Sequence, residues 1–175
     1  MIAKVTPPIG TADAPRLLGW REWVALPALG LPAVKAKLDT GARTSAIHAF
    51  DIEPGTDENG RRVVRFSTRP VQRNEDLVVR CAAELVDQRR VTDSGGHRAD
   101  RYVVRTTLVL GEVHRDIELT LTDRADMLFR MLIGRTALVP DQAVVPSRSF
   151  LLGRMNARAA YAALSSPDAS TGTGA

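Results

Sequence analysis

The chain has 175 residues, 44% of them hydrophobic and 25% charged, a composition that suits one globular domain with tails. A single cysteine excludes an intrachain disulfide, and the lack of an apolar run of ~18 residues argues against a membrane span, so we expect a cytoplasmic protein. The net charge of +4 is carried mostly by scattered arginines, which suit acidic partners but form no aromatic–basic motif for nucleic acid.

Short strands dominate the predicted elements. The expected strands lie within residues 17–30, where the run ends at Pro27, and within 31–42, 61–71, 76–91 and 101–123, while residues 131–139 give three apolar residues and Gly134 before a run that could make one or two helical turns. In the second of these, apolar and polar residues alternate, which places Val34, Ala36 and Leu38 on one face. Residues 51–62 are polar with proline and glycine, so we expect an inserted loop there. Residues 101–123 predict a hairpin that turns near Gly111.

Regular short strands without a sustained helical period predict an all-β fold, a closed or partly closed barrel with short helices. The alanine-rich stretch 153–164 predicts a C-terminal helix, and the small polar residues after it predict a disordered tail. We therefore divide the chain into a flexible arm at residues 1–15, one domain at 16–153, and a helix with tail at 154–175.

Two short motifs carry the candidate chemistry. Asp39, Thr40 and Gly41 directly follow the apolar end of a predicted strand, and residues 132–135 read Leu-Ile-Gly-Arg before a short helical turn. An aspartate, a hydroxyl and a glycine in a row can form an ordinary turn. A carboxylate at the end of a strand can also act as an acid–base catalyst, so both interpretations stay open at this point.

The two motifs together resemble the retropepsin-like aspartic proteases. Four segments, "LDTGARTSAIHA", "RYVVRTTLVLG", "LTDRADMLFRMLIGRTAL" and "VPSRSFLLG", are similar to a bacterial branch labelled ATP-dependent zinc protease. Its members occur beside, or fused to, ATP-grasp glutamate ligases that add glutamates to ribosomal protein S6. The resemblance covers roughly residues 17–153 and implies a homodimeric acid-protease barrel.

The zinc and the ATP of that label are not supported by the residues. Catalytic zinc usually takes three protein ligands and keeps an open position. Here His48, His97 and His114 are widely spaced, and neither an H-E-x-x-H nor a G-x-x-x-x-G-K-[ST] motif occurs. We expect no metal and no cofactor, and we interpret His48 as a packed histidine.

The resemblance implies catalysis by Asp39, Thr40 and Gly41. In such enzymes two carboxylates share one proton and activate a water molecule for attack on the peptide bond. Since one chain supplies one suitable aspartate, the second Asp39 would come from the other copy in a symmetric homodimer. Thr40 would form a hydrogen bond across the dimer, and Gly41 would let the backbone pass close to the carboxylates.

Substrate recognition departs from the viral pattern at Arg43. Viral retropepsins carry an acid at this position, and it pairs with the arginine that corresponds to Arg135. Two arginines cannot pair, so either Arg43 faces an acidic substrate or one of the two pairs with Asp51 or Glu53. A glycine pair in residues 93–97 predicts a flap over the substrate, or a plain hairpin loop. The expected substrate-binding residues are Arg43, Gly95, Gly96, Arg101 and Arg135.

The leading hypothesis is an aspartic endopeptidase that acts on an acidic or polyglutamate-tailed protein such as ribosomal protein S6. Two alternatives stay open. The fold could serve as a binding module for acidic tails with slow or no hydrolysis. It could also be a structural partner of a glutamate ligase, in which the dimer matters and Asp39 does not.

Overall fold

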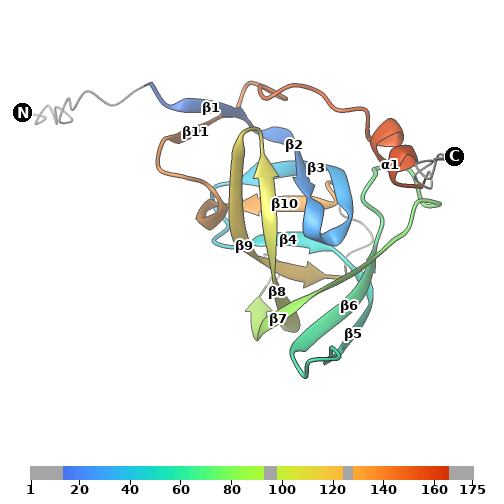
Figure 1. Ribbon diagram of the computed structural model, residues 1–175. Coiled ribbons are helices and arrows are strands. Elements are labelled where there is room, and N and C mark those ends of the chain that lie inside the picture. The colour runs from blue at the N-terminus through green and yellow to red at the C-terminus, as the bar shows by residue number, and fades with distance from the viewer. Residues whose placement is uncertain (1–13, 93–97, 124–127, 166–175) are drawn as a thin grey trace, which may run out of the picture.

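A computed structural model describes residues 14–92, 98–123 and 128–165 (Figure 1). The strands are β1 Arg16–Gly19, β2 Arg21–Leu26, β3 Leu31–Asp39, β4 Ser45–His48, β5 Phe50–Thr56, β6 Arg62–Thr68, β7 Val79–Thr92, β8 Arg98–Leu110, β9 Val113–Thr122, β10 Met131–Gly134 and β11 Gln142–Val145. The helical elements are η1 Pro27–Leu29, η2 Arg135–Ala137 and α1 Ala157–Ser165. Nearly all of the expected arm and the last ten residues of the expected tail lie outside the described residues. No helix in the described part of the chain is long and apolar enough to cross a membrane.

Six strands close into a barrel in the order β2, β3, β10, β4, β9 and β8, as Figure 1 shows. Closure comes from β8, which also pairs with β2 where Val109 lies opposite Ala25. Strands β7, β6 and β5 continue the sheet beyond β8, and β1 pairs in parallel with β11 as a separate ribbon. The all-β barrel expected from the sequence is confirmed.

Strand β3 shows how the sequence places the core. Val34, Ala36 and Leu38 are buried, while Lys35 and Lys37 between them are half-buried on the other face. This is the alternation that the sequence predicts for a strand with one face in the core. The β8–β9 hairpin also turns where expected, at Gly111, whose φ of 61° suits glycine.

The expectation of a loop at residues 51–62 is wrong for most of that segment. Phe50–Thr56 forms β5, which pairs with β6, and the turn is confined to the residues between these two strands. Asp57 holds the turn by accepting backbone hydrogen bonds from Asn59 and Arg61 at 2.9 and 2.8 Å. Pro54 is tolerated because β5 is the edge strand, where a missing N–H costs no ladder bond.

Glu22 is a fully buried carboxylate that joins β2 to the C-terminal segment. Its Oε1 accepts backbone hydrogen bonds from Gly19 at 2.6 Å and from Leu151 at 2.8 Å, and its Oε2 accepts one from Leu152 at 3.4 Å. A buried carboxylate is stable only when such donors replace its water shell. Glu22 therefore fixes the chain after Ser149 against the start of the barrel.

We predict that Glu22→Gln lowers the free energy of unfolding by about 2 kcal/mol, because the new amide group directs N–H donors at backbone N–H groups. Urea denaturation measures the loss. The exposed Glu58 serves as a control, and Glu58→Gln should change stability by no more than about 0.5 kcal/mol. Equal stability of wild type and Glu22→Gln would mean that the carboxylate bonds contribute nothing.

Candidate active site

Asp39 is the last residue of β3 and begins an exposed loop at the edge of the barrel. Its Oδ1 accepts hydrogen bonds from the backbone N–H groups of Gly41 and Ala42, both at 3.2 Å. The Ala42 N–H also reaches the Asp39 carbonyl at 3.1 Å, so the loop closes as a tight turn. Asp39 is half-buried, and its Oδ2 accepts no hydrogen bond from the described residues.

Gly134 at the end of β10 lies directly behind this loop. β10 runs between β3 and β4, and Gly134 is in register with Asp39. A Cβ on Gly134 would lie 2.5 Å from the Thr44 carbonyl carbon and 2.7 Å from the Arg43 carbonyl oxygen, closer than side chains approach backbone. Only glycine fits at position 134, because two stretches of backbone are in contact there and leave no room for a side chain.

Residues after Gly134 hold three successive carbonyl groups of the loop. Arg135 donates through Nη1 to the Gly41 oxygen at 3.0 Å and through its backbone N–H to the Ala42 oxygen at 2.9 Å. Thr136 donates to the Arg43 oxygen from both its backbone at 3.1 Å and its hydroxyl at 2.7 Å. Arg135, which the sequence predicts to contact substrate, thus also positions the loop that carries Asp39.

Thr40 and Arg43 project from the loop into solvent. The Thr40 hydroxyl is exposed and has no hydrogen-bond partner within the described residues. The Arg43 side chain is also exposed and makes no ion pair in the described part of the chain. Neither Asp51 nor Glu53 pairs with an arginine of this loop, so the structure does not contain the pairing that the sequence left open.

An open hollow of about 660 Å³ lies beside Arg43. Its lining includes Arg89 from β7 and Glu118 from β9, which form an ion pair at 2.7 Å. Arg89 also pairs with Asp87 at 2.5 Å, so its charge is satisfied within the chain. Arg43 is therefore the cation of this hollow that remains available to a ligand.

The glycines of the expected flap, Gly95 and Gly96, follow β7 and precede β8 in the sequence, and they lie outside the described residues. Arg101 lies on β8, half-buried and in register with Arg89 of β7. The structure thus brings Asp39, Thr40, Gly41, Arg43 and Arg135 into one loop region and places Arg101 on β8.

The described donor side chains do not gather into a metal site. Within the described residues no cluster of three or more His, Cys, Asp or Glu side chains is close enough to hold one. His48 is buried and stacks on Phe50 at 5.9 Å between ring centroids, and burial lowers its pKa, with the Arg130 charge adding to the effect. His48 is a packed histidine, as the sequence suggests.

Sequence reasoning missed two residues that support the site. Buried Ser45 accepts a hydrogen bond from the Gly134 N–H at 3.1 Å, and Thr136 holds the Arg43 carbonyl. Neither bond is local in the sequence, so no spacing rule reveals them. The short polar side chains beside both motifs were the only available signal.

Comparison with known proteins agrees with this geometry. A family model described as RimB-like, retropepsin-like aspartic endopeptidase RimB, matches residues 17–155. A "Probable alpha-L-glutamate ligase" of Shewanella halifaxensis is 43% identical over 145 residues, which are 83% of this chain and 31% of the relative. One from Parasynechococcus marenigrum is 44% identical over 137 residues, 78% of this chain and 29% of that protein. The chain thus spans less than a third of the length of these curated relatives.

A crystal structure shares the fold. A protein of unknown function from Legionella pneumophila matches with a TM-score of 0.66 and 28% identity, covering 78% of this chain and 97% of that one. The family match extends from β1 to just before α1, and it includes the Asp39 loop and the Gly134 crossing. The chain therefore belongs to the RimB-like family of retropepsin-like aspartic endopeptidases.

Proposed function

We propose that this chain is an aspartic peptidase that works as a symmetric homodimer and hydrolyses peptide bonds with water held between two Asp39 carboxylates. The observation that carries the proposal is the Asp39 loop itself. It presents a half-buried carboxylate at the barrel edge, fixed by two backbone N–H groups and braced from behind by Gly134. One such carboxylate per chain requires a second copy to complete a dyad.

In the proposed mechanism the two carboxylates share one proton, because like charges a few ångströms apart cannot both ionise. The ionised Asp39 takes a proton from the water, and the protonated one donates to the carbonyl oxygen of the scissile bond. Water is the nucleophile, so no covalent enzyme intermediate forms. The tetrahedral diol then collapses: its C–N bond breaks as the carboxylic acid formed in the first step protonates the leaving nitrogen, and the other carboxylate takes a proton back from a diol hydroxyl. The exposed Thr40 hydroxyl, which has no described partner in its own chain, would bond to the loop of the second copy.

An acidic substrate is supported by Arg43. Its guanidinium has no ion pair among the described residues and faces an open hollow beside the catalytic loop. Charge-assisted hydrogen bonds to a carboxylate would satisfy it. We propose a glutamate-rich protein segment as substrate, and a polyglutamate tail on ribosomal protein S6 as one candidate.

A second candidate function follows from the names of the relatives. The matching region is a part of proteins named glutamate ligases, so this chain could bind such a ligase or its acidic product without hydrolysis. The two functions differ in what Asp39 does. If the chain serves as a binding partner, Asp39→Asn would leave complex formation and its biological effect intact.

We predict a dimer in solution, with twice the 19.0 kDa mass of one chain. Light scattering at micromolar concentration measures this mass. Thr40→Ala should shift the equilibrium toward monomer, whereas Thr56→Ala on the edge strand β5 should not. A strictly monomeric protein that still cleaves peptides would rule out the dyad.

We predict that Asp39→Asn lowers the hydrolysis rate by more than about 10⁴-fold, since the amide can neither accept nor deliver the proton. The thermal unfolding midpoint should stay the same or rise, because the fold does not depend on the charge. Cleavage of a glutamate-rich peptide, followed by mass spectrometry, measures the loss. Activity retained in the variant would place the chemistry at another residue.

We predict that Arg43→Ala lowers kcat/KM for glutamate-rich peptides about ten-fold or more, since such hydrogen bonds contribute roughly 1.5–3 kcal/mol. A neutral peptide should be affected little, and Arg43→Lys should recover part of the activity. The control is Arg61→Ala in the turn between β5 and β6, which removes the same charge far from the loop. Equal loss on acidic and neutral peptides would make Arg43 structural.

A further inference from the structure

The outer face of β3 carries two lysines in line with Asp39. Side chains at alternate positions of a strand share a face, so Lys35, Lys37 and Asp39 point to the same side of β3. At ~3.3 Å per residue, Lys37 lies about 7 Å and Lys35 about 13 Å from Asp39 along the strand. The neighbouring strand adds Arg21, which lies opposite Lys37 in the β2–β3 register. We call Arg21, Lys35 and Lys37 the basic face.

The basic face has no acidic counterpart. Within the described residues none of its three members makes an ion pair with a carboxylate. Arg21 instead donates to the Ser149 hydroxyl at 3.1 Å. Burial lowers the pKa of Lys35, and nearby arginines, Arg21 first among them, lower it further. Such a cluster of like charges is unfavourable unless an anion offsets it.

Aromatic rings hold two of these cations in place. The Arg21 guanidinium lies 4.7 Å from the Trp20 ring centroid, and the Lys35 ammonium lies 5.2 Å from that of Trp23. Both also lie over Phe150, at 5.1 and 5.8 Å. Cation–π contacts fix the direction of a charge without neutralising it. Arg21 and Lys35 are therefore held in place and still positively charged.

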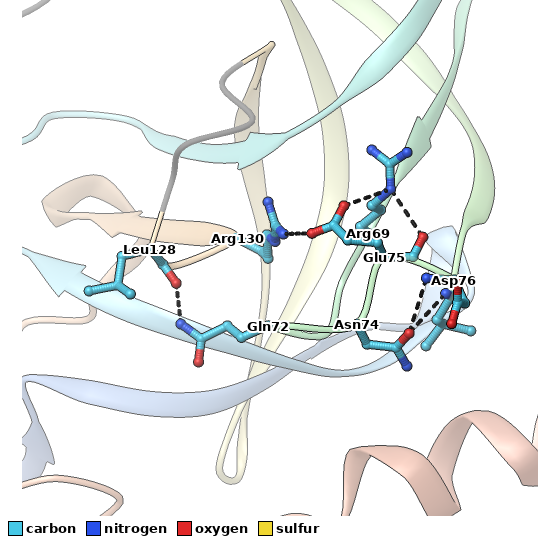
Figure 2. A network of polar contacts seen from close by, with 8 residues as sticks. Arg69, Gln72, Asn74, Glu75, Asp76, Leu128 and Arg130 are labelled. Carbon is cyan, nitrogen blue, oxygen red and sulfur yellow. Dashed lines mark hydrogen bonds and ion pairs between the residues drawn. The ribbon is translucent and has the colours of Figure 1, made fainter.

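Arg21 and Lys35 of the basic face, but not Lys37, line a hollow of about 500 Å³, together with Arg73, Arg130 and others. The one acid among the described residues that line it, Glu75, is already engaged. Figure 2 shows Glu75 between Arg130, at 2.8 Å, and Arg69, at 3.2 Å. Its charge is therefore taken up, and the hollow keeps an excess of positive charge.

Backbone strain supports a functional interpretation of the hollow. The described non-glycine residues with positive φ are Asp51, Arg73 and Phe150, and two of them lie at this cluster. Arg73 has a φ of 59° and lines the hollow. Phe150 has a φ of 56°, and its ring makes the cation–π contacts with Arg21 and Lys35. Such conformations cost of order 1–3 kcal/mol and gather at functional sites.

We propose that the basic face binds acidic side chains of the substrate on one side of the scissile bond. This inference rests on the proposed function and names further specificity-determining residues for it. An extended peptide repeats its side chains on one face every ~6.6 Å, which matches the spacing of Lys37 and Lys35 along β3. Alternate glutamates of an acidic segment would therefore meet Lys37 and then Lys35, while Arg21 contacts the first of them.

The test measures binding apart from hydrolysis. Full-length Asp39→Asn protein is titrated into fluorescein-labelled hexaglutamate, and anisotropy gives the dissociation constant. The double variant Lys35→Gln, Lys37→Gln in the same background should bind about ten-fold or more weakly. Arg61→Gln removes a charge elsewhere and should change affinity less than two-fold. Lys35→Arg with Lys37→Arg keeps both charges and should retain most of the affinity.

Each outcome separates the inference from the proposed function. Weak binding by the glutamine variant, with an unchanged thermal unfolding midpoint, supports the basic face even if the wild type never cleaves a peptide. Unchanged binding in that variant overturns the inference even if the wild type is an active peptidase. If the double variant unfolds, the dissociation constant of Lys35→Gln alone is compared with that of Arg61→Gln. Equal dissociation constants would overturn the inference. Competition by tripolyphosphate as strong as by unlabelled hexaglutamate would also overturn it, since the face would then select charge alone.

Discussion

The close approach of two backbone stretches at Gly134 is the contact on which the site depends. Strand β10 passes between β3 and β4, and its last residue touches the chain at Arg43 and Thr44, with no room for a side chain. From that crossing, Arg135 and Thr136 reach three successive loop carbonyls, and Ser45 accepts the Gly134 N–H. At about 1 kcal/mol net for each hydrogen bond, these contacts hold the loop against the end of β10. The Asp39 dyad that we propose would need such support, because its two carboxylates would have to meet within a few ångströms.

The same crossing explains how Arg135 stays in position although this chain lacks the acid that pairs with the corresponding arginine in viral retropepsins. An acid after the Asp-Thr-Gly motif would hold Arg135 through its carboxylate, but this chain has Arg43 there. Arg135 instead donates to the Gly41 carbonyl, a backbone group that every sequence supplies. The loop is thus stabilised without that ion pair, and the Arg43 side chain is not needed to hold it. The consequence is an exposed guanidinium beside the Asp39 loop, and its availability is what led us to propose an acidic substrate.

The sequence predicts best where a local rule and the tertiary structure agree. Alternation in β3 identifies Val34, Ala36 and Leu38 as core, and the glycine at position 134 signals a tight packing point. The β5–β6 hairpin was missed because strand pairing outweighs a polar composition with Pro54 and Gly55. Glu22 was missed too. It lies on the same face of β2 as buried Val24 and Leu26, and a charged residue at such a position predicts a buried polar contact. The partners of Ser45, Thr136 and Arg135 depend on contacts about 90 residues apart in the sequence, which no local pattern encodes.

Exposed or half-buried cations lie on both sides of the Asp39 loop, although Asp116 and Glu118 also line the hollow beside Arg43. Strand β3 leads back from Asp39 to Lys37 and Lys35, while the loop leads forward to Arg43. A net charge of +4 spread evenly over the surface would attract anions only weakly. Cations gathered beside Asp39 would instead orient an acidic substrate relative to that carboxylate. A two-fold axis through the paired loops would repeat both sets of cations on the second copy. An extended acidic segment would then meet cations on each side of the bond to be cut, so that specificity would depend on where the negative charges lie along the substrate as well as on how many there are.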